Sequence, residues 1–340
     1  MELTPRKRAI LAAIVKYHID TGEPVGSKWL TGVLENAPSS ATLRNEMSDL
    51  CTLGYLKQPH TSAGRVPTSK GYEFYVKRLM NQDSLPDSLK QSVDMHLKGR
   101  AQDIENLPRA AAEMLSSITG LPAFYAKISD DNIVLKRIEV MPIGGHLVML
   151  VAFTSDGRAG SKLCRIGSLL TAEAVNKISS LIKKNTEGKT LNELSLGNLQ
   201  GILSELGANT LLFLPLVSTL SEMIREIGKS QIDLCGEHNL YLSSGSPLEL
   251  ISFVERKDGI LSIIERPLTS ASVIFGSDTG YSAMQSHCLA VAPFGVKDFL
   301  LGRIGVIGST RMSYGRILPS VAYVADKVSQ IMNENFETVE

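Results

Sequence analysis

The sequence has few cysteines, no long apolar run and no net charge, and each of these shortages excludes a class of protein. Its four cysteines, Cys51, Cys164, Cys235 and Cys288, form no C-x-x-C pair, which argues against a zinc site and against a dense disulfide framework. The longest nearly continuous apolar stretch, His146 to Phe153, is far shorter than the ~20 residues that a membrane-spanning helix needs. We therefore expect reduced cysteines that serve as packing residues, and no contact with a membrane.

Two further absences bear on location and class. No apolar run of the signal-peptide type follows the first charges in MELTPRKR, so a cytoplasmic location is expected. The composition is not that of a disordered chain, because 43% of the residues are hydrophobic and 21% are charged. At 340 residues the chain exceeds the usual size of one hydrophobic core, which predicts two or three domains.

The neutral total charge hides an asymmetry along the chain. Residues 1–80 hold 11 Lys and Arg against 7 Asp and Glu, whereas residues 81–340 hold 24 against 28. A basic amino-terminal segment on a slightly acidic body fits one nucleic-acid-binding domain attached to something that is not one.

The basic segment begins with two predicted helices. Thr4 followed by Pro5 is typical of a helix start, and apolar residues then recur at helical spacing until Gly22 ends the helix. Ser27 is the expected cap of a short second helix that ends near Asn36. Its apolar face would be formed by Trp29, Leu30, Val33 and Leu34.

A third helix, opened by Pro38 and Ser39, has two different faces. Leu43, Met47 and Leu50 fall on one side of the helical wheel. The opposite side carries small or polar residues: Ala41, Thr42, Arg44, Asn45 and Ser48. Small residues permit close approach to a major groove, where Arg can pair with guanine and Asn with adenine. This is the predicted recognition helix. The alternative is that its polar face only contacts solvent, which would be favoured if the helix stood alone, without the neighbouring helices, the ribbon and the basic excess.

The segment after the third helix predicts a β-ribbon. Tyr55–Gln58 is the first strand, Pro59–Gly64 the turn and Arg65–Pro67 the return, after which Thr68 or Ser69 caps a fourth helix. Gly64 is expected to allow close backbone approach and a positive φ, and Arg65 to meet phosphate or enter a minor groove. Three helices, a ribbon and a basic excess together predict a winged helix-turn-helix. The predicted DNA-binding residues are Lys28, Ser39, Ser40, Thr42, Arg44, Asn45, Ser48, His60, Thr61, Ser62, Gly64 and Arg65.

The body reads as one α+β domain interrupted by another. Three strand-like runs joined by Gly144-Gly145 and Asp156-Gly157 predict a three-stranded antiparallel sheet over about 132–166. Helical sequence follows up to about residue 229, divided by Pro215. Strands then resume at 271–275, 288–293 and 302–308, before a final helix. Three strands covered by helices form a self-contained unit.

Several motifs resemble the heat-inducible transcription repressor family called HrcA. They are GEPVGSK at 22–28, SSATLRNEMSDL at 39–50, GYLKQPHTSAGRVPTSKGY at 54–72 and IGVIGSTRMSY at 304–314. The family usually has proline at Ser309 and an acidic residue at Ser313, and a Glu-Asn pairing appears here as CGEHN at 235–239, so these loops depart from its pattern.

The resemblance implies a function and a domain plan. The function is that of a homodimeric repressor that binds an inverted-repeat, CIRCE-type operator of heat-shock chaperone operons. Heat stress would release the repressor, and the GroE chaperonin would support its activity. The plan is a winged helix-turn-helix at 1–81, a GAF-like domain in two segments at 82–129 and 232–340, and an inserted dimerising domain at 130–231.

An enzyme is the competing hypothesis. The sequence GSTRMSY could be read as a phosphate cradle, yet it lacks the G-x-x-x-x-G-K-[ST] order, and a glycine turn between a strand and the last helix is the simpler interpretation. Neither a carboxylate pair nor a nucleophile with its base is recognisable, so we expect no enzyme, cofactor or metal. The other class left open is a small-molecule sensor or enzyme that uses its winged helix for protein contacts. Such a protein would bind duplex DNA weakly and without sequence preference.

Overall fold

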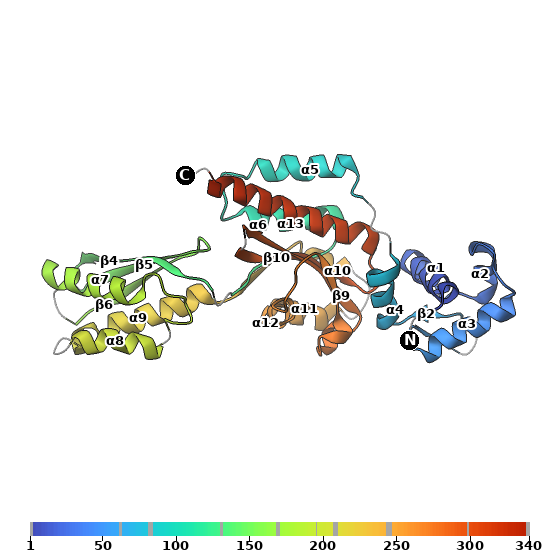
Figure 1. The fold of residues 1–340 in the computed structure, drawn as a ribbon, viewed down its shortest axis with the longest axis horizontal. Coiled ribbons are helices and arrows are strands. Elements are labelled where there is room, and N and C mark those ends of the chain that lie inside the picture. Colours follow the sequence, from blue (N-terminus) through green and yellow to red (C-terminus); the bar gives the residue numbers. More distant parts are fainter. Residues whose placement is uncertain are drawn as a thin grey trace. The chain divides into compact units, whose positions relative to one another are not determined.

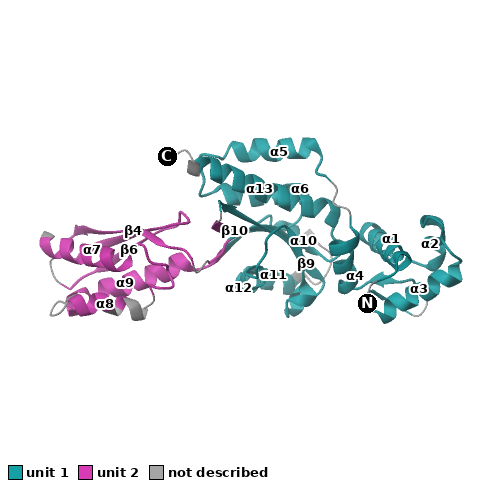
Figure 2. Cartoon of the chain, in the orientation of Figure 1, with its two compact units in different colours: residues 1–126, 232–298, 302–340 teal, residues 127–231, 299–301 magenta. Residues whose placement is uncertain are grey.

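The fold was analysed in a computed structural model. The structure describes residues 3–60, 63–80, 84–129, 132–167, 171–194, 196–206, 210–242, 247–297 and 299–337. The chain forms two compact units (Figure 2), one made of 1–126, 232–298 and 302–340 and the other of 127–231 and 299–301. Within the described ranges, every helix is too short or too polar to cross a lipid bilayer.

The first unit begins with a small helical region, residues 3–80, which we call the head. Its elements are α1 (Pro5–Thr21), α2 (Ser27–Val33), α3 (Ser40–Thr52), β1 (Leu56–Lys57), β2 (Val66–Pro67), α4 (Ser69–Phe74) and a π-helical turn (Tyr75–Leu79). The strands β1 and β2 form an antiparallel ribbon. Three helices are therefore followed by a ribbon and a fourth helix, in the order expected from the sequence.

The helix ends of the head follow from local chemistry. The Thr4 hydroxyl accepts a hydrogen bond from the Lys7 amide at 3.3 Å, and Gly22 ends α1 in the left-handed region with φ 76°. The Thr68 hydroxyl caps α4 by accepting a bond from the Gly71 amide at 3.1 Å. These predicted starts and stops are confirmed.

The prediction for the second helix was wrong in two respects. Gly26 occupies the cap position and Ser27 is the first helical residue. Only Leu30 of the expected apolar face is buried, whereas Val33 is 50% exposed. Seven residues make two turns, and such a short helix presents a single position to the core.

The rest of the first unit is a five-stranded sheet with helices on both sides (Figure 1). Its strand order is β7 (Gln231–Cys235), β3 (Ala123–Lys127), β10 (Phe299–Ser309), β9 (His287–Val296) and β8 (Ser272–Phe275). One side is covered by α6 (Leu107–Thr119) and α13 (Tyr314–Glu337), and α5 (Asp87–Lys98) packs on the outside of these two helices. The other side carries α11 (Pro247–Glu255) and α12 (Asp258–Ile264), while α10 (His238–Leu242) follows β7 and its Asn239 donates a hydrogen bond to the Ser116 hydroxyl of α6 at 3.1 Å.

The second unit is built on a separate three-stranded antiparallel sheet. Its strands are β4 (Leu135–Gly144), β5 (Leu147–Thr154) and β6 (Ala159–Arg165), and its helices are α7 (Ala172–Thr186), α8 (Leu196–Leu206) and α9 (Thr210–Gly228). The three predicted strands and their two glycine turns are confirmed. The prediction that Pro215 separates helices was wrong, because it lies inside α9. Burial of Phe213, Leu216 and Leu220 from that helix outweighs the hydrogen bond that proline cannot make.

The two faces of this sheet differ. Ile138, Leu150, Ala152 and Cys164 belong to the core that the helices cover. The opposite face is apolar but exposed: Met141, Ile143, Leu147, Phe153 and Leu163 are 40–58% exposed. In the strand register Met149 pairs with Met141 on one side and with Leu163 on the other, so these three side chains form a row across the open face.

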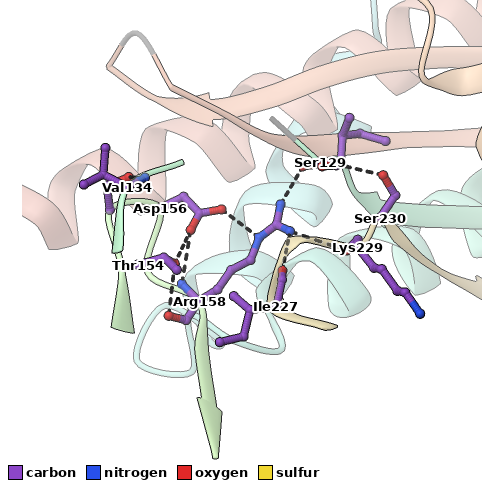
Figure 3. Close-up of polar contacts among 10 residues, drawn as sticks. Ser129, Val134, Thr154, Asp156, Arg158, Ile227, Lys229 and Ser230 are labelled. Atoms are coloured by element: carbon purple, nitrogen blue, oxygen red, sulfur yellow. Dashed lines mark hydrogen bonds and ion pairs between the residues drawn. The ribbon is translucent and has the colours of Figure 1, made fainter. Parts of the chain in front are cut away.

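Arg158 connects the turn between β5 and β6 with the first and last segments of the second unit (Figure 3). Its guanidinium forms an ion pair with Asp156 at 2.7 Å, and the two side chains are only 9% and 4% exposed. It also donates hydrogen bonds to the carbonyl oxygens of Ile128 at 2.5 Å and Ile227 at 3.0 Å. The arginine thereby joins the β5–β6 turn to the two chain segments through which the unit begins and ends.

The four cysteines are free thiols. Burial raises the pKa of Cys235 to about 11 and that of Cys288 to about 12. Because the thiolate is the reactive form, these two side chains stay protonated near neutral pH and act as packing residues.

Candidate nucleic-acid interface

The third helix of the head separates apolar and polar residues as its sequence predicts. Leu43, Met47 and Leu50 are buried, at 0–3% exposure. On the other side, Ala41, Arg44, Asn45 and Ser48 are exposed, and Thr42 is half-buried. Burial of the apolar stripe fixes how α3 is rotated, so that the polar groups face outward.

The predicted residues at the start of α3 have local partners. The Ser39 hydroxyl accepts a hydrogen bond from the Thr42 amide at 3.3 Å, which caps the helix. The Ser40 hydroxyl lies 2.9 Å from that of Ser27 and ties α2 to α3. These hydroxyls position the helix, while Arg44, Asn45 and Ser48 form its outward surface.

The ribbon continues into the link between α1 and α2. Arg65 and Val25 exchange two backbone hydrogen bonds, of 2.8 and 2.9 Å. A methyl group placed on Gly64 would lie 2.4 Å from the Val25 carbonyl oxygen, so glycine is required there for close approach. The expected close approach is confirmed, but the expected positive φ is wrong, since Gly64 is absent from the left-handed glycines of the described chain. Contact with a distant segment, not local backbone conformation, selects this glycine.

A hollow of about 410 Å³ lies between α3 and the ribbon. It brings together two of the predicted residues, Arg44 from the helix and Arg65 from the return strand. The other residues that line it are Val25, Gly26, Ser27, Met47, Gln58, Ala63 and Gly64. The Arg65 Nε is buried and has no hydrogen-bond partner within the described residues. The Arg65 guanidinium beside this polar hollow is suited to an anion such as a phosphate, whereas Arg44 lies on the exposed face of α3.

The remaining predicted residues are placed only in part. Lys28 on α2 is exposed, and His60 is exposed with its carbonyl oxygen accepting a hydrogen bond from the Ala63 amide at 2.9 Å. Thr61 and Ser62 lie outside the described residues. The interface predicted from the sequence is therefore brought together at Arg44, Gly64 and Arg65.

Two lining residues were not predicted as part of the interface. Gln58 donates a hydrogen bond to the Ala63 carbonyl oxygen at 3.1 Å across the ribbon, and Ser27 was expected only to cap a helix. Their positions become apparent only when the ribbon folds beside α3. Part of the basic excess is also neutralised, because Lys7 forms ion pairs with Asp49 at 2.8 Å and Glu46 at 3.7 Å. The hydrogen bond to Asp49 is the main reason that the pKa of Lys7 is raised.

Comparison with known proteins agrees with the motifs. The family model described as HrcA protein C terminal domain matches residues 105–318. The chain belongs to the HrcA family. A heat-inducible transcription repressor HrcA of Clostridioides difficile (strain 630) is 32% identical over 334 residues, covering 96% of this chain and 98% of the relative. That of Acetivibrio thermocellus is 29% identical, covering 97% and 96%. This chain is therefore similar to heat-inducible transcription repressors over nearly its whole length.

The fold also has a counterpart among solved structures. A crystal structure described as a hypothetical protein at 2.2 Å resolution matches with a TM-score of 0.58 and 22% identity, and the match covers 98% of this chain and 99% of the other. At that identity the likeness shows a shared fold only. It supports a mixed α+β architecture across the HrcA-like chain.

Proposed function

We propose that this protein is a DNA-binding repressor of heat-shock chaperone operons whose head is a winged helix-turn-helix. The observation that carries the proposal is the exposed polar face of α3, where Arg44 and Asn45 point away from a buried apolar stripe beside the ribbon. A major groove admits one helix, and arginine and asparagine are the side chains that read guanine and adenine through two bonds each. Membership of a family of transcription repressors supports the same function.

The interface divides into groups that read bases and groups that hold the backbone. Arg44, Asn45 and Thr42 would contact base edges, with Ser48 beside them on the same helix. Phosphate contacts would come from Lys28, Thr61, Ser62 and Arg65, and Ser39, Ser40, His60 and Gly64 would complete the contact surface. This division fits the usual protein–DNA interface, in which phosphate contacts fix the register and base contacts give the specificity.

We further propose that the active form is a homodimer on an inverted-repeat, CIRCE-type operator. A two-fold dimer presents two heads to two half-sites, so the symmetry of the operator mirrors that of the protein. The inserted segment 130–231 would be the dimerising domain, between the two segments of a GAF-like domain at 82–129 and 232–340. Its open sheet face, with Met141, Leu147, Phe153 and Leu163 exposed, supports this role.

Heat would release the repressor by lowering its folded population, and the GroE chaperonin would restore that population. The protein would act in the cytoplasm, where its operator lies. Operator occupancy measured with and without chaperonin, from growth temperature to heat-shock temperature, tests this part. Occupancy that does not change with temperature in the absence of chaperonin would contradict it.

A titration of the full-length protein with a fluorescent inverted-repeat duplex tests DNA binding. We expect affinity to fall steeply with salt and to exceed that for scrambled DNA by about a thousandfold or more. Arg44→Ala should cost about 1–3 kcal/mol of binding free energy and relax the preference for the operator. Arg78→Ala is the matched control, because it removes one exposed positive charge from the π-helical turn of the same head.

Two results would count against the proposal. Equal affinity for operator and scrambled duplex would show that the protein does not recognise a DNA sequence. Equal losses for Arg44→Ala and Arg78→Ala would show that the α3 face contributes only its charge.

A further inference from the structure

The loop between β10 and α13 lies in a motif that the candidate interface does not use. Its backbone is fixed by internal hydrogen bonds, since the Ser309 hydroxyl accepts from the Arg311 amide at 3.2 Å and the Ser309 carbonyl oxygen accepts from the Met312 amide at 2.9 Å. The Thr310 amide donates to the Ser286 carbonyl oxygen at 3.0 Å. Arg311 therefore projects from a fixed turn and not from a loose loop.

Arg311 lies against the end of the first helix of the head. A methyl group placed on Gly22 would fall 2.4–2.7 Å from three atoms of the Arg311 guanidinium, which shows how closely that group covers the glycine. Gly22 ends α1, and its amide bonds to the His18 carbonyl oxygen at 3.0 Å. A cation at the carboxyl end of a helix is favoured by the helix dipole, so the contact is attractive as well as close.

Buried aromatic rings continue the contact between the head and the five-stranded domain. Tyr72 of α4 lies 6.2 Å from Tyr314, measured between ring centroids, and Tyr314 lies 6.0 Å from Phe275 of β8. All three side chains are 1–3% exposed. We call Tyr72, Phe275 and Tyr314 the aromatic seam. In Figure 1 one end of α13 lies beside α4 of the head, in agreement with the Tyr72–Tyr314 contact.

Polar contacts fix the rings of the seam. The Tyr314 hydroxyl donates to the Thr310 carbonyl oxygen at 2.6 Å, and the Tyr72 hydroxyl lies 2.6 Å from Nδ1 of His18 on α1. Purely apolar surfaces can slide past each other, whereas buried rings with satisfied hydroxyls have one preferred register. The seam and Arg311 thus define one orientation of the head against the five-stranded domain.

We propose that Arg311 and Tyr314 are positioning residues that hold the head in the orientation needed for two heads of a dimer to occupy two half-sites together. The inference rests on the proposed repressor function. When two linked modules bind one DNA, the second event benefits from a high effective concentration only if the geometry matches the site. Loosening the head would lower affinity for the complete inverted repeat and leave affinity for a single half-site unchanged.

The experiment uses the full-length chain and two duplexes, the complete inverted repeat and a repeat with one half scrambled. Arg311→Ala should weaken binding to the complete repeat by about tenfold or more, within the gain that linkage can supply, and should leave half-site binding within about twofold of the wild type. Arg311→Lys, which keeps the charge but not the planar group, should recover part of the loss. Arg256→Ala is the control, since it removes an exposed arginine just after α11 in the same unit.

Tyr314→Phe is a second variant, because it keeps the ring and removes the bond to Thr310. It should show the same split between complete and half-site duplex, with a smaller effect. If this buried substitution prevents folding, as seen by circular dichroism, Arg311→Ala still tests the positioning role, because Arg311 is exposed and its replacement should not prevent folding.

The outcomes separate the two proposals. A wild-type protein that binds neither duplex would refute the repressor function itself. If the wild type binds and Arg311→Ala behaves like Arg256→Ala on both duplexes, the positioning role is wrong. An equal loss on both duplexes would overturn it too, and would assign Arg311 to a direct phosphate contact.

Discussion

His18 links the ionisation of a single residue to the stability of the head. Burial, followed by the positive charges of Arg311 and Lys57, lowers the pKa of this histidine below its ordinary 6.5. Burial also raises the pKa of Tyr72, so its hydroxyl keeps its proton and can donate to Nδ1 of a neutral His18. Protonation of that nitrogen would remove the acceptor and place a cation near two others.

The histidine therefore predicts a loss of stability on acidification. Because its pKa in the folded protein is below the unfolded value, its contribution is fully present above pH 6.5 and is lost as the pH falls through the folded pKa. Buried His287, whose pKa is also lowered, acts in the same direction. Urea unfolding across this pH range should show a smaller pH dependence for His18→Gln than for the wild type. An identical pH dependence in the two proteins would show that other groups control the effect.

Two glycines of the head should respond in opposite ways to alanine. At Gly64 the added methyl would meet the Val25 backbone, and such overpacking costs about 1–3 kcal/mol of unfolding free energy. At Gly32, inside α2, nothing lies within 4 Å of the added carbon, so alanine should stabilise the helix by about 0.5–1 kcal/mol. Thermal unfolding of both variants tests the pair. A Gly64→Ala protein as stable as the wild type would mean that the ribbon does not press on Val25.

At the scale of elements, Arg158 should matter more than other ion-paired residues of its unit. Replacing Arg158 with alanine leaves the Asp156 carboxylate, which is 4% exposed, without its partner. Removing one member of a buried pair costs about 3–5 kcal/mol. The control, Arg137→Ala, breaks a pair in which the arginine is 70% exposed, for which about 0–1 kcal/mol is expected. Urea unfolding curves of the two variants should therefore separate clearly, and overlapping curves would argue against the role shown in Figure 3.

The elements that the sequence predicted well are those with a local signal. The strands β4, β5 and β6 were recognised because two tight-turn signals, Gly144-Gly145 and Asp156-Gly157, separate three strand-like runs, and α3 because its buried stripe recurs at helical spacing. The strands β3 and β7 were missed because each has only five residues and their pairing joins segments about a hundred residues apart. Such strands form because neighbouring strands supply their hydrogen bonds.

The candidate interface also has one part that could be predicted from local sequence and another part that depends on distant segments. The polar face of α3 follows from one helix and could be predicted, including Arg44 and Asn45. The role of Gly64 depends on Val25, which is remote in sequence. The prediction of a positive φ, made from the turn sequence alone, was therefore wrong. Gln58 joined the hollow only through the folding of the ribbon.

At the scale of the whole molecule, the topology explains how one unit can be inserted into another. The segment that forms the second unit leaves the five-stranded sheet after β3 and returns at β7, and these two strands are neighbours in that sheet. The two ends of the insertion therefore lie close together, which is the condition under which a domain can be inserted without disrupting its host. Arg158 then holds the entering and leaving segments at Ile128 and Ile227.

The open sheet face of the second unit carries the last prediction, on assembly. Leu163 is 58% exposed at the end of the row formed with Met141 and Met149, so lysine there should be tolerated by the fold of the single chain. If this face joins two copies, Leu163→Lys would bury a charge in the contact and shift the protein to the 36.9 kDa monomer in sedimentation equilibrium. Leu248→Lys, at a residue that is 77% exposed in the first unit, should keep the wild-type mass.

On the proposed repressor function, in which a dimer places two heads on two half-sites, Leu163→Lys should also lose affinity for the complete inverted repeat and keep it for a half-site. A Leu163→Lys protein that remains dimeric would place the contact between subunits elsewhere.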